Sequence, residues 1–244
     1  MREIVLCIKC MSTVITIIIN IKKMKNNFKN ADKAFRHYKN YIKDYGVDFD
    51  DTRALFNIGF YINNPMSNLI SCADRNWKWD YAEAEWQWYL SGDNNIKKLG
   101  ELYGKIPEIW RRMADKYGHV NSNYGYQWQR SDWNGISQFD YVVNLLKQNP
   151  KTRQAAISIY DGKEHNNYEL DTPCTYAIQF TIVGQKLNMC VTMRSNDLWY
   201  GFCNDQYCFS KLQELVATET GLLIGSYYHF AHNLHLYDNI IEKL

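Results

Sequence analysis

Residues that interrupt regular structure are scarce in this chain of 244 residues, which contains 13 glycines and 4 prolines. This composition excludes collagen-like repeats and argues against long low-complexity linkers. An excess of charge of one sign is also absent, because 28 basic and 26 acidic side chains leave a net charge of +2. A field this weak gives no long-range attraction to a phosphate backbone, so we expect no nucleic-acid partner.

A disulfide framework is absent as well. The seven cysteines are an odd number with irregular spacing, which predicts free thiols in a reducing compartment and so a cytoplasmic location. Cys7 and Cys10 have the C-x-x-C spacing of zinc sites, but no second pair accompanies them. The apolar run Met11–Ile21 is too short for the ~20 residues of a membrane span, so we expect no membrane contact. We treat residues 1–23 as an apolar N-terminal extension without an assigned role and residues 24–244 as one catalytic domain.

Aromatic side chains are plentiful, at 15% of the residues, and they recur in helix-like and strand-like segments. Apolar residues at helical spacing predict helices over 31–45, 81–90, 106–117, 139–147 and 209–219. Alternating or continuous apolar runs predict strands over 55–62, 155–160, 175–183, 186–193 and 222–237. This mixed order of elements favours the α+β class.

Four polar clusters stand out from these segments. Asp171–Thr175 contains Cys174, which is either a nucleophile or, as is commoner for a lone cysteine, a small buried hydrophobe. Met193–Asp197 carries the arginine and serine of a phosphate cradle, or is a solvated loop. Gly201–Asp205 and Asn121–Trp128 are turns by default.

Together the clusters resemble the thymidylate synthase superfamily, over the stretch from about Glu83 to Tyr237. The resemblance rests on motifs with matching order and spacing: Glu85-x-x-Trp88-x-Leu90-x-Gly92-Asp93-x-Asn95-Ile96, Ile109-Trp110, Tyr124-Gly125-x-Gln127-Trp128, Asn149-Pro150-x-x-Arg153, Pro173-Cys174, Gln179-Phe180, Arg194-Ser195-x-Asp197, Gly201 and His235-Leu236-Tyr237. It implies an α+β fold in which helices flank a mixed β-sheet. It also implies a homodimer that pairs through a sheet face and shares each active site between two subunits.

Within the superfamily, the sequence is most similar to the bacteriophage deoxycytidylate (dCMP) hydroxymethylases. Asn121–Gly125 and Met193–Asp197 follow the phage pattern, and Thr175 stands after the nucleophile where the synthases usually have histidine. Asp205 occupies the place where the synthases have the asparagine that reads uracil.

The change to aspartate at position 205 has a chemical meaning. Uracil presents an N3–H donor and an O4 acceptor, which a carboxamide can satisfy, whereas cytosine presents an N3 acceptor and an N4 amino donor. A protonated carboxyl group complements the cytosine edge, because it donates to N3 and accepts from N4. Burial can keep such an acid neutral, and donation to N3 also makes C6 more electrophilic.

The resemblance implies a mechanism in which the Cys174 thiolate adds to C6 of the pyrimidine, with Arg194 lowering the pKa of the thiol. C5 then attacks the one-carbon unit of the co-substrate 5,10-methylenetetrahydrofolate. A hydroxymethylase adds water at the step where a synthase delivers hydride, so the expected product is 5-hydroxymethyl-dCMP. Glu85 is the implied general acid and base, and Tyr124 supports removal of the C5 proton.

The same motifs imply the binding residues. Arg194 and Ser195 are implied to bind the phosphate of the nucleoside monophosphate, and Arg153 is implied to reach the phosphate across the dimer interface. His235 and Tyr237 are implied to bind the sugar 3′-hydroxyl. Stacking and hydrogen-bonding contacts to the folate are assigned to Trp110 and Asp197. No metal is implied, because the expected strand places His232 on the opposite face from His229 and His235.

Three other activities stay open at this point. The chain could be a thymidylate synthase or a dUMP hydroxymethylase, or a cytidylate C5-methylase that keeps the hydride step. It could also be a catalytically impaired homologue that only binds nucleotide.

Overall fold

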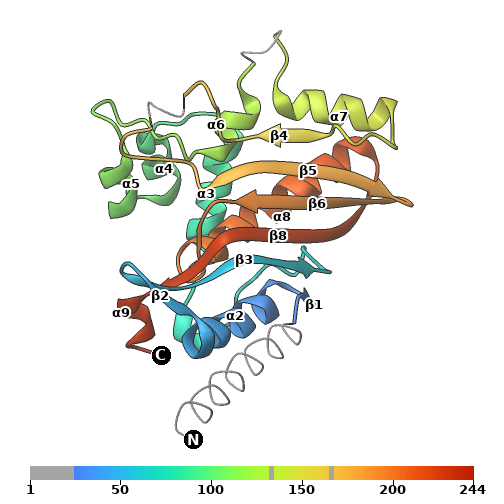
Figure 1. Ribbon diagram of the computed structural model, residues 1–244. Helices are drawn as coiled ribbons and strands as arrows, with labels where there is room; N and C mark the ends of the chain where they lie inside the picture. The colour runs from blue at the N-terminus through green and yellow to red at the C-terminus, as the bar shows by residue number, and fades with distance from the viewer. Residues whose placement is uncertain (1–24, 132–134, 165–167) are drawn as a thin grey trace, which may run out of the picture.

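A twisted sheet runs through the protein in the computed structural model, which describes residues 25–131, 135–164 and 168–244 (Figure 1). The expectations for residues 1–23, including Cys7 and Cys10, lie outside these ranges. Six strands follow the spatial order β1-β3-β8-β6-β5-β4, while β2 pairs with β3 and β7 pairs with β8. The strands are β1 (Asn27–Phe28), β2 (Val47–Phe49), β3 (Thr52–Ile62), β4 (Ala156–Ser158), β5 (Thr175–Val183), β6 (Lys186–Met193), β7 (Asn196–Asp197) and β8 (Leu223–Tyr237).

Helices pack against one face of this sheet and complete the fold (Figure 1). Both α2 and α8 pack on β8, while α3 packs on α4, α6 and α8. The helices are α2 (Ala31–Tyr45), α3 (Trp79–Ser91), α4 (Ile96–Tyr103), α5 (Glu108–Met113), α6 (Tyr124–Gln129), α7 (Gln138–Gln148), α8 (Gly201–Thr220) and α9 (Asp238–Ile241), with a 3₁₀ turn at Ala73–Arg75. The mixed sheet with flanking helices confirms the α+β class.

Strand β8 shows how the sheet separates its two faces. It pairs antiparallel with β3 and parallel with β6, so it has a neighbour along both edges. Tyr227, His229 and Ala231 are fully buried toward the helices. Phe230 and His232 alternate with them and are partly or fully exposed on the opposite face. The predicted separation of His232 from His229 is therefore confirmed.

Most predicted elements occur close to their predicted bounds, and the differences have local causes. The predicted helix 106–117 is shortened to α5, because the Asp115 carboxylate accepts hydrogen bonds from the amides of Tyr117 and His119 and closes a turn. Helix α8 begins at Gly201 rather than at residue 209, because the segment that reads as a polar turn buries Phe202 in the core.

The short helices α4, α6 and α9 were not predicted at all. Asn95 caps α4 by accepting a hydrogen bond from the amide of Lys97, and Asn123 caps α6 by accepting one from the amide of Tyr126. Helix α6 occupies the cluster that reads as a turn by default. Each helix has eight residues or fewer, so its apolar periodicity is too brief to identify it.

Gly125 sets how closely α6 approaches α3. A Cβ atom at this position would overlap the backbone of Tyr89, so only glycine fits without moving one helix. We expect Gly125→Ala to destabilise the protein by about 3 kcal/mol, because the overlap is with backbone that cannot rotate away. Thermal unfolding measures this loss. Gly162→Ala is the matched control, since a Cβ at position 162 would have no atom within 4 Å, and an equal loss in both variants would contradict the explanation.

Candidate active site

Cys174 lies immediately before β5, where the pairing of β5 with β6 brings it beside Arg194. Thr175 pairs with Met193, and the Arg194 amide donates to the Cys174 carbonyl at 2.8 Å. The Arg194 guanidinium donates to the carbonyls of Pro173 at 3.1 Å and Thr172 at 2.8 Å. Arg194 therefore holds the segment that carries the cysteine.

The electrostatic state of Cys174 differs from the expectation based on sequence. Burial raises the pKa of this thiol to about 11, and the nearby charge of Arg194 opposes the rise without cancelling it. Asp205 adds to the rise. The expected effect of Arg194 is therefore present, because its charge lowers the pKa of Cys174, but desolvation is the larger effect and the net pKa is raised.

Asp205 lies in the first turns of α8 and is partly buried. The Nδ2 of Asn196 donates to its Oδ2 at 2.7 Å. Burial raises the pKa of the Asp205 carboxyl to about 7; the Asn196 bond opposes this rise and the charge of Asp197 adds to it. A large fraction of this acid is therefore neutral near pH 7.

Glu85, on α3, lies near Asp205 and is only 5% exposed. Burial raises the pKa of its carboxyl to about 8, with a further contribution from Asp205, while Tyr81 acts in the opposite direction. Its Oε2 has no hydrogen-bond partner among the described residues. An unpartnered acid oxygen at this depth is suited to meet a ligand or a water molecule.

Aromatic rings form the wall next to Glu85. Trp110 is buried and donates its Nε1–H to the Tyr81 hydroxyl at 2.7 Å, and its ring meets Trp88 edge to face with centroids 5.3 Å apart. Tyr124, the first residue of α6, stacks on Phe209 at 5.6 Å. Burial raises the pKa of Tyr124 well above its ordinary value, and the proximity of Asp205 and Cys174 adds to this.

The β7–β8 pairing contributes the far side of the pocket. It places Asp197 opposite His235, and the His235 and Tyr237 rings meet edge to face at 5.4 Å. Asp197 accepts hydrogen bonds from the amides of Trp199 and Tyr200 at 2.8 and 3.0 Å, while burial raises the pKa of its carboxyl to about 6. Burial also raises the pKa of Tyr237, helped by Asp197 and by Cys174.

Two polar anchors of the site were not identified from the sequence. Buried Asp171 accepts a hydrogen bond from the Ser122 amide at 2.6 Å and another from the Ser122 hydroxyl, which ties the α6 loop to the Cys174 segment. Asn196 bonds Asp205, as described above. Both pairs join segments that are separate polar clusters in the sequence, so no local pattern reveals them.

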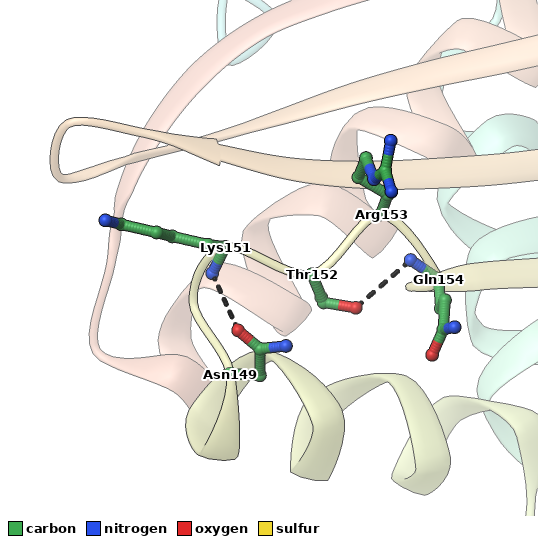
Figure 2. A pocket seen from close by; sticks show the side chains of 5 residues that line it. All are labelled: Asn149, Lys151, Thr152, Arg153 and Gln154. Atoms are coloured by element: carbon green, nitrogen blue, oxygen red, sulfur yellow. Dashed lines mark hydrogen bonds between the residues drawn. The ribbon is translucent and has the colours of Figure 1, made fainter.

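Ser195 and Arg153 complete the residues expected at the site. Ser195 is partly exposed between Arg194 and Asn196. Arg153 lies elsewhere, on an exposed loop between α7 and β4, where it lines a pocket of about 490 Å³ with Asn149, Lys151, Thr152 and Gln154 (Figure 2). Ala156 pairs with Gln179, so Arg153 lies roughly 20 Å from Cys174 at the ~3.3 Å rise of a strand residue. The structure does not bring it into the pocket of its own chain.

Comparison with known proteins gives one consistent answer. The thymidylate synthase family model matches residues 47–244. A thymidylate synthase from Fusobacterium nucleatum subsp. nucleatum is 33% identical over 217 residues, which are 88% of this chain and 72% of that protein. The chain belongs to the thymidylate synthase family. The thermostable thymidylate synthase A from Bacillus subtilis has the same fold, with a TM-score of 0.74 and 24% identity over 87% of this chain and 82% of that one.

Two features are absent from the described part of this thymidylate synthase family member. No helix within residues 25–131, 135–164 and 168–244 has the length and apolar character needed to cross a bilayer. In the same ranges, no group of three or more histidine, cysteine, aspartate or glutamate side chains is arranged to hold a metal ion.

The buried acid Glu85 predicts how stability depends on pH. Because its pKa is raised from 4.5 to about 8, the folded state holds this proton more tightly than the unfolded state. Its stabilising effect is complete below pH 4.5 and is lost as the pH rises toward 8, by roughly 3 kcal/mol between pH 5 and pH 8. We expect Glu85→Gln to flatten the fall in unfolding free energy over this interval in urea titrations.

Glu101→Gln is the control for this measurement, because Glu101 is exposed on α4 and pairs only with Lys98 at the surface. It should leave the slope unchanged. A Glu85→Gln protein whose stability falls with pH as steeply as the parent would show that Glu85 is not the titrating group.

Proposed function

We propose that this enzyme transfers a one-carbon unit from 5,10-methylenetetrahydrofolate to C5 of dCMP and completes the reaction with water, giving 5-hydroxymethyl-dCMP. The observation that supports this choice is the Asp205 carboxyl, whose pKa is raised to about 7 by burial in the pocket that also holds Cys174. A neutral acid there complements the N3 and N4 edge of cytosine, whereas an ionised one would meet N3 with no proton to donate.

Cys174 is proposed as the nucleophile at C6. A proton donated by Asp205 to N3 withdraws electrons from C6, which favours formation of the S–C6 bond. Since the pKa of Cys174 is about 11, the thiol must lose its proton as the bond forms rather than before it. The gain of electron density at C5 then allows C5 to form its bond to the one-carbon unit.

Glu85 and Tyr124 are proposed to handle protons at C5 and at the incoming water. A carboxyl with a pKa of about 8 can both give and take a proton near neutral pH. The unpartnered Oε2 of Glu85 is the atom available for this transfer. Loss of the C5 proton and release of tetrahydrofolate, as the bond between the one-carbon unit and the folate nitrogen breaks, leave an exocyclic methylene group. Water adds to this group, and departure of the Cys174 sulfur from C6 gives the hydroxymethyl product.

The folate fits the wall of the pocket. We assign the stacking contact to Trp110, whose Nε1–H bonds the Tyr81 hydroxyl, and the hydrogen-bonding contact to Asp197, which lies opposite His235. When bound there, 5,10-methylenetetrahydrofolate supplies a one-carbon unit. Phosphate is assigned to Arg194 and Ser195, and the sugar 3′-hydroxyl is assigned to His235 and Tyr237.

A homodimer is part of the proposal. Tyr61 is 43% exposed and contacts Tyr228 on the sheet face opposite the helices, with ring centroids 4.6 Å apart. Covering this aromatic surface favours pairing of two sheets. The Arg153 guanidinium makes no hydrogen bond or ion pair with any described residue, so it is available to bind a phosphate in the partner's site.

Thymidylate synthesis from dUMP is the second candidate, because the relatives named above are thymidylate synthases. Incubation with 5,10-methylenetetrahydrofolate and either nucleotide separates the two. We expect 5-hydroxymethyl-dCMP from dCMP, and loss of all product in Cys174→Ser but not in the control Cys190→Ser. Turnover of dUMP alone would reject the proposal, and formation of dihydrofolate from dCMP would indicate a methylase.

Asp205→Asn tests the basis of specificity directly. A carboxamide can accept from N3–H and donate to O4 of uracil. In that orientation it does not give cytosine the donor to N3 and the acceptor for N4 that a neutral acid provides. We expect dCMP turnover to fall about 100-fold, as for the loss of paired hydrogen bonds to a base edge, and turnover of dUMP to rise. Steady-state kcat/KM for both nucleotides measures the change; unaltered dCMP turnover would refute the assignment of Asp205.

A further inference from the structure

A chain of polar side chains runs from Asp205 into the core. Asn196 donates from Nδ2 to Asp205 Oδ2 at 2.7 Å. His229 Nε2 lies 3.0 Å from Asn196 Oδ1, and the Tyr227 hydroxyl lies 2.7 Å from His229 Nδ1. Asn196 is 3% exposed, and His229 and Tyr227 are fully buried. Burying several connected polar groups costs free energy unless each has a hydrogen-bond partner, and each member of this chain has one.

The direction of every bond in this chain is determined by its neighbours. Because Asn196 presents Nδ2 to Asp205, its Oδ1 faces His229 and must accept a proton from Nε2. Burial lowers the pKa of His229 to about 3, so the ring is neutral and carries one proton. With that proton on Nε2, Nδ1 accepts from the Tyr227 hydroxyl. All donors therefore point toward Asp205.

Packing holds the chain in place. The His229 ring lies between Phe60 and Phe202, with centroids 5.2 Å from each. On the other side, a Cβ added to Gly201 would lie 3.1 Å from Asn196 Nδ2 and 3.3 Å from Asp205 Oδ2. The absence of a side chain at Gly201 thus leaves room for the Asn196–Asp205 bond.

We propose that the Tyr227–His229–Asn196 chain is a positioning device that keeps Oδ2 of Asp205 an acceptor and leaves Oδ1 to carry the proton into the pocket. Asn196 is then a specificity-determining residue, because it fixes which oxygen donates to a pyrimidine edge. The consequence for dCMP rests on the proposed function, whereas the behaviour of the Asp205 proton does not.

Among the described residues, no cationic side chain hydrogen-bonds to the Asp205 carboxyl; the nearby cations act on its neighbours, Arg194 on Cys174 and Arg75 on Asp197 and Cys203. Acids, thiols and phenols approach it from several elements, and each would raise its pKa if ionised: Glu85 on α3, Tyr124 on α6, Cys174 before β5, Asp197 on β7, Tyr227 on β8, and Cys203 and Cys208 on α8. Among the described neighbours, the Asn196 amide is the hydrogen-bond donor that acts on the carboxyl of Asp205.

The test substitutes His229 and Tyr227, the members of the hydrogen-bonded chain that do not bond to Asp205 directly. His229→Phe keeps a ring between Phe60 and Phe202 but removes the Nε2–H that fixes the Asn196 amide. His229→Gln restores a donor to Asn196, and Tyr227→Phe removes a single oxygen at the far end. His37→Phe is the matched control, because His37 also packs among aromatic rings and its buried Nε2 has no partner in the described chain.

Carbon-13 NMR of the full protein labelled at aspartate carboxyls reads the Asp205 titration without substrate, with Asp205→Asn providing the assignment. We expect His229→Phe to raise the pKa of Asp205 by about 1, because a fixed donor is lost, and His229→Gln to restore it. Tyr227→Phe should give a smaller rise and His37→Phe none. An unchanged or lowered value in His229→Phe would overturn the proposal.

Nucleotide binding adds a second measurement. The ratio of the dissociation constants for dUMP and dCMP should fall about tenfold in His229→Phe and return in His229→Gln. If the parent protein shows no preference for dCMP, the proposed function fails, while the NMR titration still decides whether the chain acts on Asp205. A preserved preference in His229→Phe would contradict the specificity role.

Discussion

Removal of carboxyl groups from water is the constraint on which the rest of the site depends. Asp205 lies close enough to Glu85 and Asp197 for their charges to interact, and burial raises the pKa of Glu85 to about 8, of Asp197 to about 6 and of Asp205 to about 7. Glu85 and Asp205 can therefore donate hydrogen bonds at neutral pH, which ionised carboxylates cannot do, whereas Asp197 is mostly ionised there.

The surrounding structure holds the Cys174 segment in place through hydrogen bonds between side chains and backbone. Arg194 donates hydrogen bonds to the two backbone carbonyls that precede Cys174, and Asp171 accepts a hydrogen bond from the Ser122 amide. These contacts link loops that come from different parts of the chain. The nucleophile is consequently positioned by long-range hydrogen bonds as well as by the start of β5, and a static pocket of this kind suits a reaction that depends on the placement of one base edge.

The sequence predicted the parts of the fold that have a long, regular pattern. Strands β5 and β6 occur with the predicted bounds because each has a sustained apolar run, and α2 begins at the residue after its Asn30 cap. The start of α8 was missed because its first residues are polar enough to read as a turn. Short capped helices such as α6 give too few residues for a periodic signal.

The candidate site was predictable where chemistry is encoded in motifs, and not where it depends on burial. Cys174, Asp205 and Glu85 were found from the family resemblance, and the structure brings them together. The high pKa of Cys174 was not foreseen, since desolvation is a property of the packed pocket. The contact of Asn196 with His229 was equally invisible, because 33 positions separate the two residues.

The central claim is that a neutral Asp205 reads the amino edge of cytosine. A crystal structure with dCMP bound tests it most directly. The account predicts that cytosine N3 and N4 both lie within about 3 Å of the Asp205 carboxyl oxygens, with C6 facing Cys174 Sγ. A base that turns this edge away from Asp205, or that binds with C6 remote from Cys174, would contradict it.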